Sequence, residues 1–140
     1  MNRKDFLKSF LAKGLLVTFP LRLMSRKKKL KRVLIYRHHV AGFQYAEGMK
    51  LIHEMKEGDE LLLVREPENT FDPEAVAVYW RQHRIGYVPA ADNEMPNHFL
   101  LHGLMLHARI EKLNRTSKPW QICEAGIYLL YPKELLRRNK

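Results

Sequence analysis

The side chains with the clearest chemical potential lie in a short polar loop between two apolar segments. Residues 65–74 read R-E-P-E-N-T-F-D-P-E, with Asn69 and Asp72 near two prolines. An asparagine can cap its own turn, and a residue that precedes proline is pushed to an extended backbone. The Asp72 carboxylate could therefore accept N–H groups of its own loop, or a hydroxyl or amine of a ligand. Spacing alone favours the first interpretation and leaves the second open.

Aromatic side chains occur around this loop and offer surfaces on which nucleic-acid bases stack. They are Phe43 and Tyr45 before the loop, Phe71 within it, Tyr87 after it, and Trp120 on a distant turn. A base stacked on such a ring contributes about 1–3 kcal/mol to binding. The alternative is that these rings belong to the core, and for Phe71 the two interpretations weigh nearly equally.

The sequence carries no motif of a familiar catalytic class. It has no P-loop, no G-x-S-x-G and no H-E-x-x-H, so the residues of the corresponding phosphate-binding, hydrolase and zinc-protease sites are missing. A single cysteine, Cys123, excludes an internal disulfide and any multi-cysteine metal site. We therefore expect a protein that is not an enzyme and that uses no cofactor.

Two groups of side chains could in principle hold a metal ion, but both have simpler interpretations. Four acids of the loop could bind a hard cation, yet the neighbouring prolines and basic residues favour a turn. These acids are Glu66, Glu68, Asp72 and Glu74. Two histidines four residues apart, with a third on the next segment, lack a neighbouring carboxylate and are more typical of surface residues. These histidines are His98, His102 and His107.

Strand-like segments on both sides must position the loop. Six short segments are β-rich, alternating or buried in character, namely residues 33–40, 60–65, 75–80, 84–88, 104–113 and 121–131. Apolar spacing predicts one helix over residues 45–55, and N-cap candidates at 91–93 predict a second helix that runs through residues 97–102. This pattern predicts a mainly β fold, a small six-stranded β-barrel with two short helices.

The net charge of +10 lies entirely in the first part of the chain. Residues 1–32 hold eleven of the 25 basic residues and one of the 15 acidic ones, which leaves residues 33–140 with fourteen of each. A domain without net charge has little long-range attraction for phosphate. Any nucleic-acid contact by residues 33–140 must therefore come from a local pocket or be assisted by the basic segment.

Residues 1–32 resemble a leader followed by a basic linker. Arg3-Lys4 followed by Phe6-Leu7-Lys8 resembles a twin-arginine export signal, although the apolar part carries charge and no A-x-A cleavage site follows. The alternative is an N-terminus that lies on a membrane surface or on the domain. The expected location is accordingly membrane-tethered or exported, or cytoplasmic if the leader is not a signal. The expected division is leader 1–32, domain 33–132 and charged tail 133–140.

Three blocks in this order resemble the HIRAN domain family. They are V-A-G-F-Q-Y at residues 40–45, L-L-L-V-R-E-P-E-N-T-F-D-P-E-A-V-A-V at 61–78, and I-G-Y-V-P at 85–89. The resemblance covers about residues 34–131, and the short export-like leader also resembles that of stand-alone bacterial HIRAN proteins. The resemblance implies an OB-like or SH3-like barrel that captures the 3′-hydroxyl end of single-stranded DNA, as the domain does in helicase relatives involved in DNA repair and replication.

The resemblance also implies a set of binding residues, with departures from the family pattern. Asp72 would accept the terminal hydroxyl, and Tyr45 and Trp120 would stack on bases. Ala46 replaces a second aromatic residue, and Ala90 replaces a basic residue that would contact phosphate. The candidate nucleic-acid-binding residues are Phe43, Gln44, Tyr45, Arg65, Asn69, Phe71, Asp72, Tyr87 and Trp120.

Two functions follow from these observations. The first is a non-catalytic module that binds single-stranded DNA 3′ ends, with a helicase or nuclease acting in trans and a membrane contact through residues 1–32. The alternative is an envelope-associated protein-interaction domain that keeps the barrel but has a lost or altered ligand pocket. The neutral charge of residues 33–140 and the presence of Ala90 favour this alternative. A catalytic role ranks last.

Overall fold

The computed structural model describes residues 30–137 of the 140-residue chain. The export-like start and most of the basic linker predicted for residues 1–32 lie outside the described residues, as do the predicted membrane contact and location that depend on them. Residues 32–130 form one compact unit, and the fold below concerns this unit. No helix within residues 30–137 is long and apolar enough to cross a membrane.

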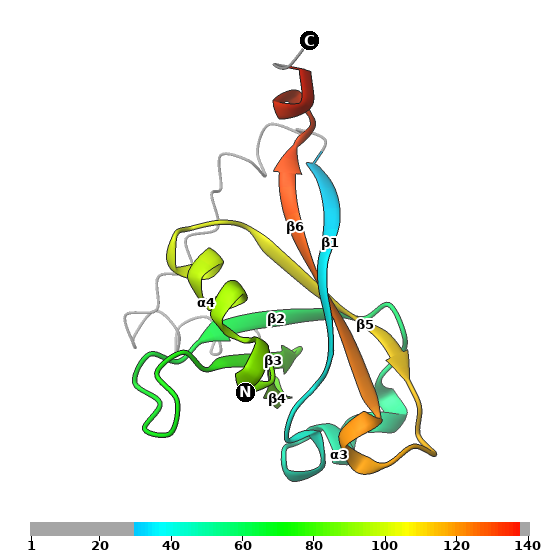
Figure 1. Cartoon of the computed structure of the whole chain (residues 1–140). Coiled ribbons are helices and arrows are strands. Elements are labelled where there is room, and N and C mark those ends of the chain that lie inside the picture. The colour runs from blue at the N-terminus through cyan, green and yellow to red at the C-terminus, as the bar shows by residue number, and fades with distance from the viewer. Residues whose placement is uncertain (1–29, 138–140) are drawn as a thin grey trace. The chain divides into compact units, whose positions relative to one another are not determined.

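Six strands form one sheet, in the order β1-β6-β5-β2-β3-β4 (Figure 1). The paired strands β2 with β3, β3 with β4, β2 with β5, and β5 with β6 all run antiparallel. The strands are β1 (Leu30–His39), β2 (Glu60–Arg65), β3 (Val76–Trp80), β4 (His83–Tyr87), β5 (Leu106–Leu113) and β6 (Cys123–Pro132). The mainly β class and the six strands predicted from the sequence are confirmed.

The sheet is not closed into the predicted barrel. Its edge strands β1 and β4 meet only through an isolated bridge between Ala41 and Tyr87. In this bridge the Ala41 N–H donates to the Tyr87 carbonyl at 2.8 Å, and the Tyr87 N–H donates to the Ala41 carbonyl at 2.9 Å. The bridge holds the segment after β1 against the end of β4, which matters for the site described below.

Short helices and 3-10 turns connect the strands, and the last turn follows β6. They are α3 (Gly48–Leu51), α4 (Glu94–Leu101) and the 3-10 turns η1 (Phe43–Tyr45), η2 (Ile52–Glu54), η3 (Ala90–Asp92), η4 (Pro119–Gln121) and η5 (Lys133–Arg137). The helix predicted over residues 45–55 is present in shorter form, because η1, α3 and η2 divide this segment and none of them has a side-chain cap. The second predicted helix is α4, which begins directly after the N-cap candidates at residues 91–93 and ends at Leu101.

The hydrophobic core lies on one face of the sheet and under the short helices. Its largest fully buried side chains include Trp80, Phe43, Met55 and Ile85. The Trp80 indole N–H donates to the Asp59 carboxylate at 2.9 Å, so its polar atom is satisfied inside the fold. Burial raises the pKa of Cys123 to about 12, so this thiol stays protonated at neutral pH.

We expect the buried side chain of His38 on β1 to make the stability of the fold depend on pH. The side chain is buried, its Nδ1 lies 3.0 Å from the His39 carbonyl oxygen, and its Nε2 has no hydrogen-bond partner among the described residues. Burial lowers the pKa of His38, although the bond to the His39 carbonyl and, more weakly, the nearby Asp92 and Glu124 act in the opposite direction. The folded state therefore favours the neutral ring more than the unfolded state does.

We expect the free energy of unfolding to fall as the pH drops below about 6.5, where an unfolded histidine takes up a proton. The contribution of His38 is present above this pH and is lost as the pH falls through the lowered folded-state pKa. Urea unfolding at neutral and at mildly acidic pH measures the effect. The variant His38→Gln should show a weaker pH dependence over this range. An unchanged pH dependence in the variant would exclude His38 as its source.

Candidate nucleic-acid interface

The loop between β2 and β3 is held in shape by its own side chains. The Asn69 side-chain carbonyl accepts the Phe71 N–H at 2.9 Å and the Asp72 N–H at 3.1 Å. The Asp72 Oδ1 accepts the Glu74 N–H at 2.9 Å. At the base of the loop the Glu66 N–H donates to the Ala75 carbonyl at 2.9 Å. These bonds preform the loop, as the interpretation of Asn69 as a turn cap predicts.

The second oxygen of Asp72 joins the loop to the segment before α4. Asp72 Oδ2 accepts a hydrogen bond of 2.7 Å from the side-chain amide of Asn93, which is buried. Each carboxylate oxygen has two lone pairs and here accepts one donor, so each can accept another. Asp72 is neither fully buried nor fully exposed. The two interpretations of Asp72 are therefore compatible, since it can stabilise its loop and still accept a ligand hydroxyl.

A further set of hydrogen bonds ties the loop to β4. The Tyr87 hydroxyl donates to Glu66 Oε1 at 2.8 Å, and the Asn69 amide donates to the same oxygen at 3.2 Å. Arg84 Nη1 donates to the Tyr87 hydroxyl at 2.8 Å. Burial and, second, the bond to Glu66 raise the pKa of Tyr87, so its hydroxyl stays protonated and continues to donate. Tyr87, Glu66, Asn69 and Asp72 thus form one connected unit.

Three aromatic rings of the predicted set are exposed near this unit or on elements that approach it. Tyr45 is 88% exposed, Phe71 is 97% exposed and Trp120 is 55% exposed. The Ala41–Tyr87 bridge places η1, which carries Tyr45, beside β4, and η1 also contacts η4, which carries Trp120. Rings that are exposed in this way can stack on unpaired bases.

Phe43 and Arg65 occupy different positions from the rest of the predicted set. Phe43 is fully buried against Gly48, so its ring supports η1 from the core and has no surface for a ligand. Arg65 is part-buried and donates through Nε to the Asn97 side-chain carbonyl at 2.7 Å, which joins β2 to α4. Phe43 therefore has a supporting position in the core, whereas Arg65 bonds α4 one turn after Asn93, the residue that bonds Asp72.

Gln44 lies between the buried Phe43 and the exposed Tyr45 in η1. Its Oε1 is buried and has no hydrogen-bond partner within the described part of the chain. An unsatisfied buried acceptor costs about 1–3 kcal/mol. A ligand donor that reached Gln44 would remove this cost.

The structure adds Glu66, Asn93 and Arg84 to the candidate site. The sequence pattern presented Asn93 only as a helix cap, but α4 has no side-chain cap and the Asn93 amide goes to Asp72. Glu66 entered the sequence analysis only as a potential metal ligand. No pattern in the sequence pairs it with Tyr87, because the two residues are 21 positions apart.

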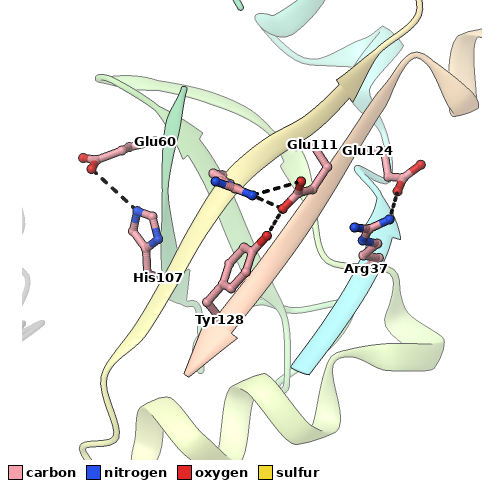
Figure 2. A network of polar contacts seen from close by, with 7 residues as sticks. Arg37, Glu60, His107, Glu111, Glu124 and Tyr128 are labelled. Carbon is pink, nitrogen blue, oxygen red and sulfur yellow. Dashed lines mark hydrogen bonds and ion pairs between the residues drawn. The ribbon is translucent and has the colours of Figure 1, made fainter. Parts of the chain in front are cut away.

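A separate polar network lies on β5, β6 and their neighbours (Figure 2). Glu111 accepts from Arg109 Nε at 3.0 Å and from the Tyr128 hydroxyl, and Arg37 lies 4.0 Å from Glu124. None of the predicted binding residues belongs to this network. Its members bond one another, which is the pattern of a structural cluster.

The histidines considered for zinc do not converge. His107 Nε2 lies 3.6 Å from Glu60 (Figure 2), whereas His98 and His102 face each other with ring centroids 6.3 Å apart. Across residues 30–137, no three side chains of histidine, cysteine, aspartate or glutamate are grouped so that they could hold a metal ion. This finding covers the acids around Asp72 as well.

The fold and the loop together define a small mainly β domain with a preformed polar loop flanked by exposed aromatic rings. The family model of the HIRAN domain matches residues 34–120. The chain belongs to the HIRAN domain family, as the three sequence blocks predicted. Membership of this family supports a nucleic-acid-binding role.

Solved structures share the fold. A crystal structure of a protein from Lactobacillus plantarum has 23% sequence identity and a TM-score of 0.64, and the match covers 73% of this chain and 98% of that one. The crystal structure of the HIRAN domain of human HLTF has 16% identity and a TM-score of 0.56, covering 74% and 82% of the two chains. At these identities the likeness concerns the fold alone. No curated protein matches the chain.

Proposed function

We propose that this chain binds the 3′-hydroxyl end of single-stranded DNA. The observation that carries the proposal is the Asp72 carboxylate, which is held by Glu74 and Asn93 and keeps acceptor capacity on both oxygens. A fixed acceptor is suited to a hydroxyl donor, because its position is set before the ligand arrives. A terminal phosphate would instead bring negative charge to a carboxylate.

Exposed rings supply the second part of the proposal. Tyr45 and Trp120 lie on turns that contact each other, and both expose more than half of their surface. Bases near a strand end are unpaired and can stack on such rings, each with about 1–3 kcal/mol. Phe71 lies in the same loop as Asp72 and offers a third ring.

The fluorescence of Trp120 provides the test. The chain has two tryptophans, and Trp80 is buried while Trp120 is exposed. We expect a linear single strand to quench the exposed tryptophan at lower concentration than a circularised strand of the same sequence, because only the linear strand has an end. The full-length chain is titrated with both, at about 0.15 M salt to limit attraction by the basic N-terminal segment.

Trp120→Ala is the control for this titration. The variant should lose the quenching and bind the linear strand about tenfold more weakly, which corresponds to the loss of one stacked base. Equal affinity of the wild-type chain for linear and circular strands would contradict end binding.

The second candidate function is a protein-interaction domain with an altered pocket. The exposed Ala90 in η3, which offers no cation for a phosphate, favours it. Absence of any strand binding by the full-length chain at low salt would support this candidate.

In the first proposal the module is not an enzyme and brings a helicase or nuclease to the strand end. Nuclease activity that disappears in Asp72→Ala would contradict this part.

A further inference from the structure

The candidate site is rich in acidic side chains and poor in cations. The loop between β2 and β3 carries Glu66, Glu68, Asp72 and Glu74, and residues 33–140 have no net charge. A DNA strand carries one negative phosphate per nucleotide. A strand whose end reached Asp72 would therefore need at least one local cation to offset this repulsion.

Arg84 on β4 is placed to supply this charge. Its Nη1 donates to the Tyr87 hydroxyl at 2.8 Å, and its Cζ lies 5.2 Å from the centre of the Tyr87 ring. Its backbone carbonyl accepts the N–H of Glu47 at 3.3 Å, two residues after Tyr45. Arg84 thus lies between the turn that carries Tyr45 and the hydroxyl that binds Glu66 of the loop.

Three arginines elsewhere in the fold have guanidinium groups that are already bonded to acidic side chains or backbone carbonyls. Arg37 and Arg109 form ion pairs with glutamates, and Arg115 donates to the backbone carbonyls of residues 52 and 55. Within residues 30–137 no acidic side chain forms an ion pair with Arg84. The nearby Glu47 carboxylate instead lies 3.0 Å from His83 Nδ1. Arg84 is exposed, so its charge faces solvent.

The bonding of Arg84 leaves a pair of donors for a ligand. A guanidinium has five N–H donors in a planar fork, which matches two oxygens of a phosphate. One Nη1 donor goes to the Tyr87 hydroxyl, so the other edge of the group is available. The Tyr87 ring and hydroxyl hold the group in place, which reduces the entropy lost when a phosphate binds.

We propose that Arg84 binds a backbone phosphodiester of the strand close to its 3′ end. This inference rests on the proposed function and adds the group that recognises the backbone, separate from the group that recognises the hydroxyl. Arg84 supplies affinity without sequence preference, whereas Asp72 discriminates between chemical forms of the end. Removing the charge of Arg84 should therefore weaken binding and leave the preference for the hydroxyl intact.

The test compares the full-length wild-type chain with Arg84→Gln, using a labelled single strand with a 3′-hydroxyl at several salt concentrations. Loss of one phosphate contact should weaken binding about tenfold at low salt. It should also make the slope of log K against log salt shallower by about 0.7. The ratio of affinities for 3′-hydroxyl and 3′-phosphate strands should stay that of the wild type. Arg84→Lys should recover part of the lost affinity.

Two controls make the result specific. Lys112→Gln removes the same charge from an exposed position on β5 and should leave affinity and salt slope unchanged. A strand with neutral methylphosphonates in place of its last two phosphodiesters should bind the wild type more weakly, and Arg84→Gln should cause little further loss with this strand.

The outcomes separate the two claims. If the wild type prefers the 3′-hydroxyl strand but Arg84→Gln has the wild-type affinity and slope, Arg84 does not bind phosphate and the proposed function stands. The same conclusion holds if Arg84→Gln weakens the binding of the methylphosphonate strand and of the native strand by equal factors. If the wild type binds no strand or shows no preference for the hydroxyl, the proposed function and the role of Arg84 both fail.

Discussion

Replacing Asp72 with asparagine is expected to weaken binding of a 3′-hydroxyl strand by about tenfold to a hundredfold. A hydrogen bond to a charged acceptor contributes about 1.5–3 kcal/mol, and the asparagine side chain of the variant carries no charge. Binding of a 3′-phosphate strand should stay equal or become stronger, because the repulsion is removed. The variant keeps the size of the side chain, and its carbonyl can still accept the Glu74 N–H. Titration of both strands with wild type and variant measures the two effects.

Glu68→Gln is the matched control for this substitution. Glu68 is an exposed acid in the same loop, and the change removes the same charge. It should leave the ratio of affinities for the two strands at the wild-type value. If both variants change this ratio equally, the general field of the loop and not the Asp72 carboxylate discriminates between the ends. Urea unfolding of both variants shows whether the loop change has affected the fold.

Gly86→Ala should cause the largest loss of stability among single substitutions near the site. Gly86 has φ +150°, and an added Cβ would collide with the Ala41 carbonyl oxygen and lie 2.6 Å from Val40 Cγ1. The first of these atoms is backbone and belongs to the Ala41–Tyr87 bridge. Strained backbone and overpacking each cost about 1–3 kcal/mol, so we expect a loss of about 2–4 kcal/mol in the free energy of unfolding.

Gly103→Ala separates the two causes. Gly103 also has a positive φ, +77°, but an added Cβ would have no atom within 4 Å. In this variant only the strained backbone conformation lowers the free energy of unfolding, by about 1–2 kcal/mol. Urea unfolding of both variants measures the difference, and equal losses would show that the close approach to Ala41 is unimportant. Gly86→Ala should also weaken strand binding, because it shifts Tyr87 away from η1.

Local patterns in the sequence predicted the strands well. The buried run predicted at residues 60–65 has the same bounds as β2. The bounds predicted for β3 and β4 differ from the observed ones by no more than one residue. These features depend on side-chain composition and alternation along a few residues, which the sequence displays directly. The open form of the sheet was not predictable in this way. It depends on how the segment after β1 meets the end of β4, and these distant segments are joined by the isolated bridge between Ala41 and Tyr87.

The site shows the same division between local and distant contacts. The turn formed by Asn69 was predictable, because its side chain bonds groups two and three residues away. The bonds from Tyr87 to Glu66 and from Asn93 to Asp72 each span 21 residues and depend on how the sheet places β4 and the start of α4. Phe43 and Tyr45 are in one turn, and only packing against Gly48 determines which ring is buried.

The central claim is that a fixed carboxylate recognises a terminal hydroxyl. The most direct test is a titration of the full-length wild-type chain with two single strands of identical sequence, one with a 3′-hydroxyl and one with a 3′-phosphate. The basic residues 1–32 attract the strand with the additional negative charge, so they would favour the phosphate. The account predicts tighter binding of the 3′-hydroxyl strand despite this attraction. Equal affinity, or tighter binding of the 3′-phosphate strand, would contradict it.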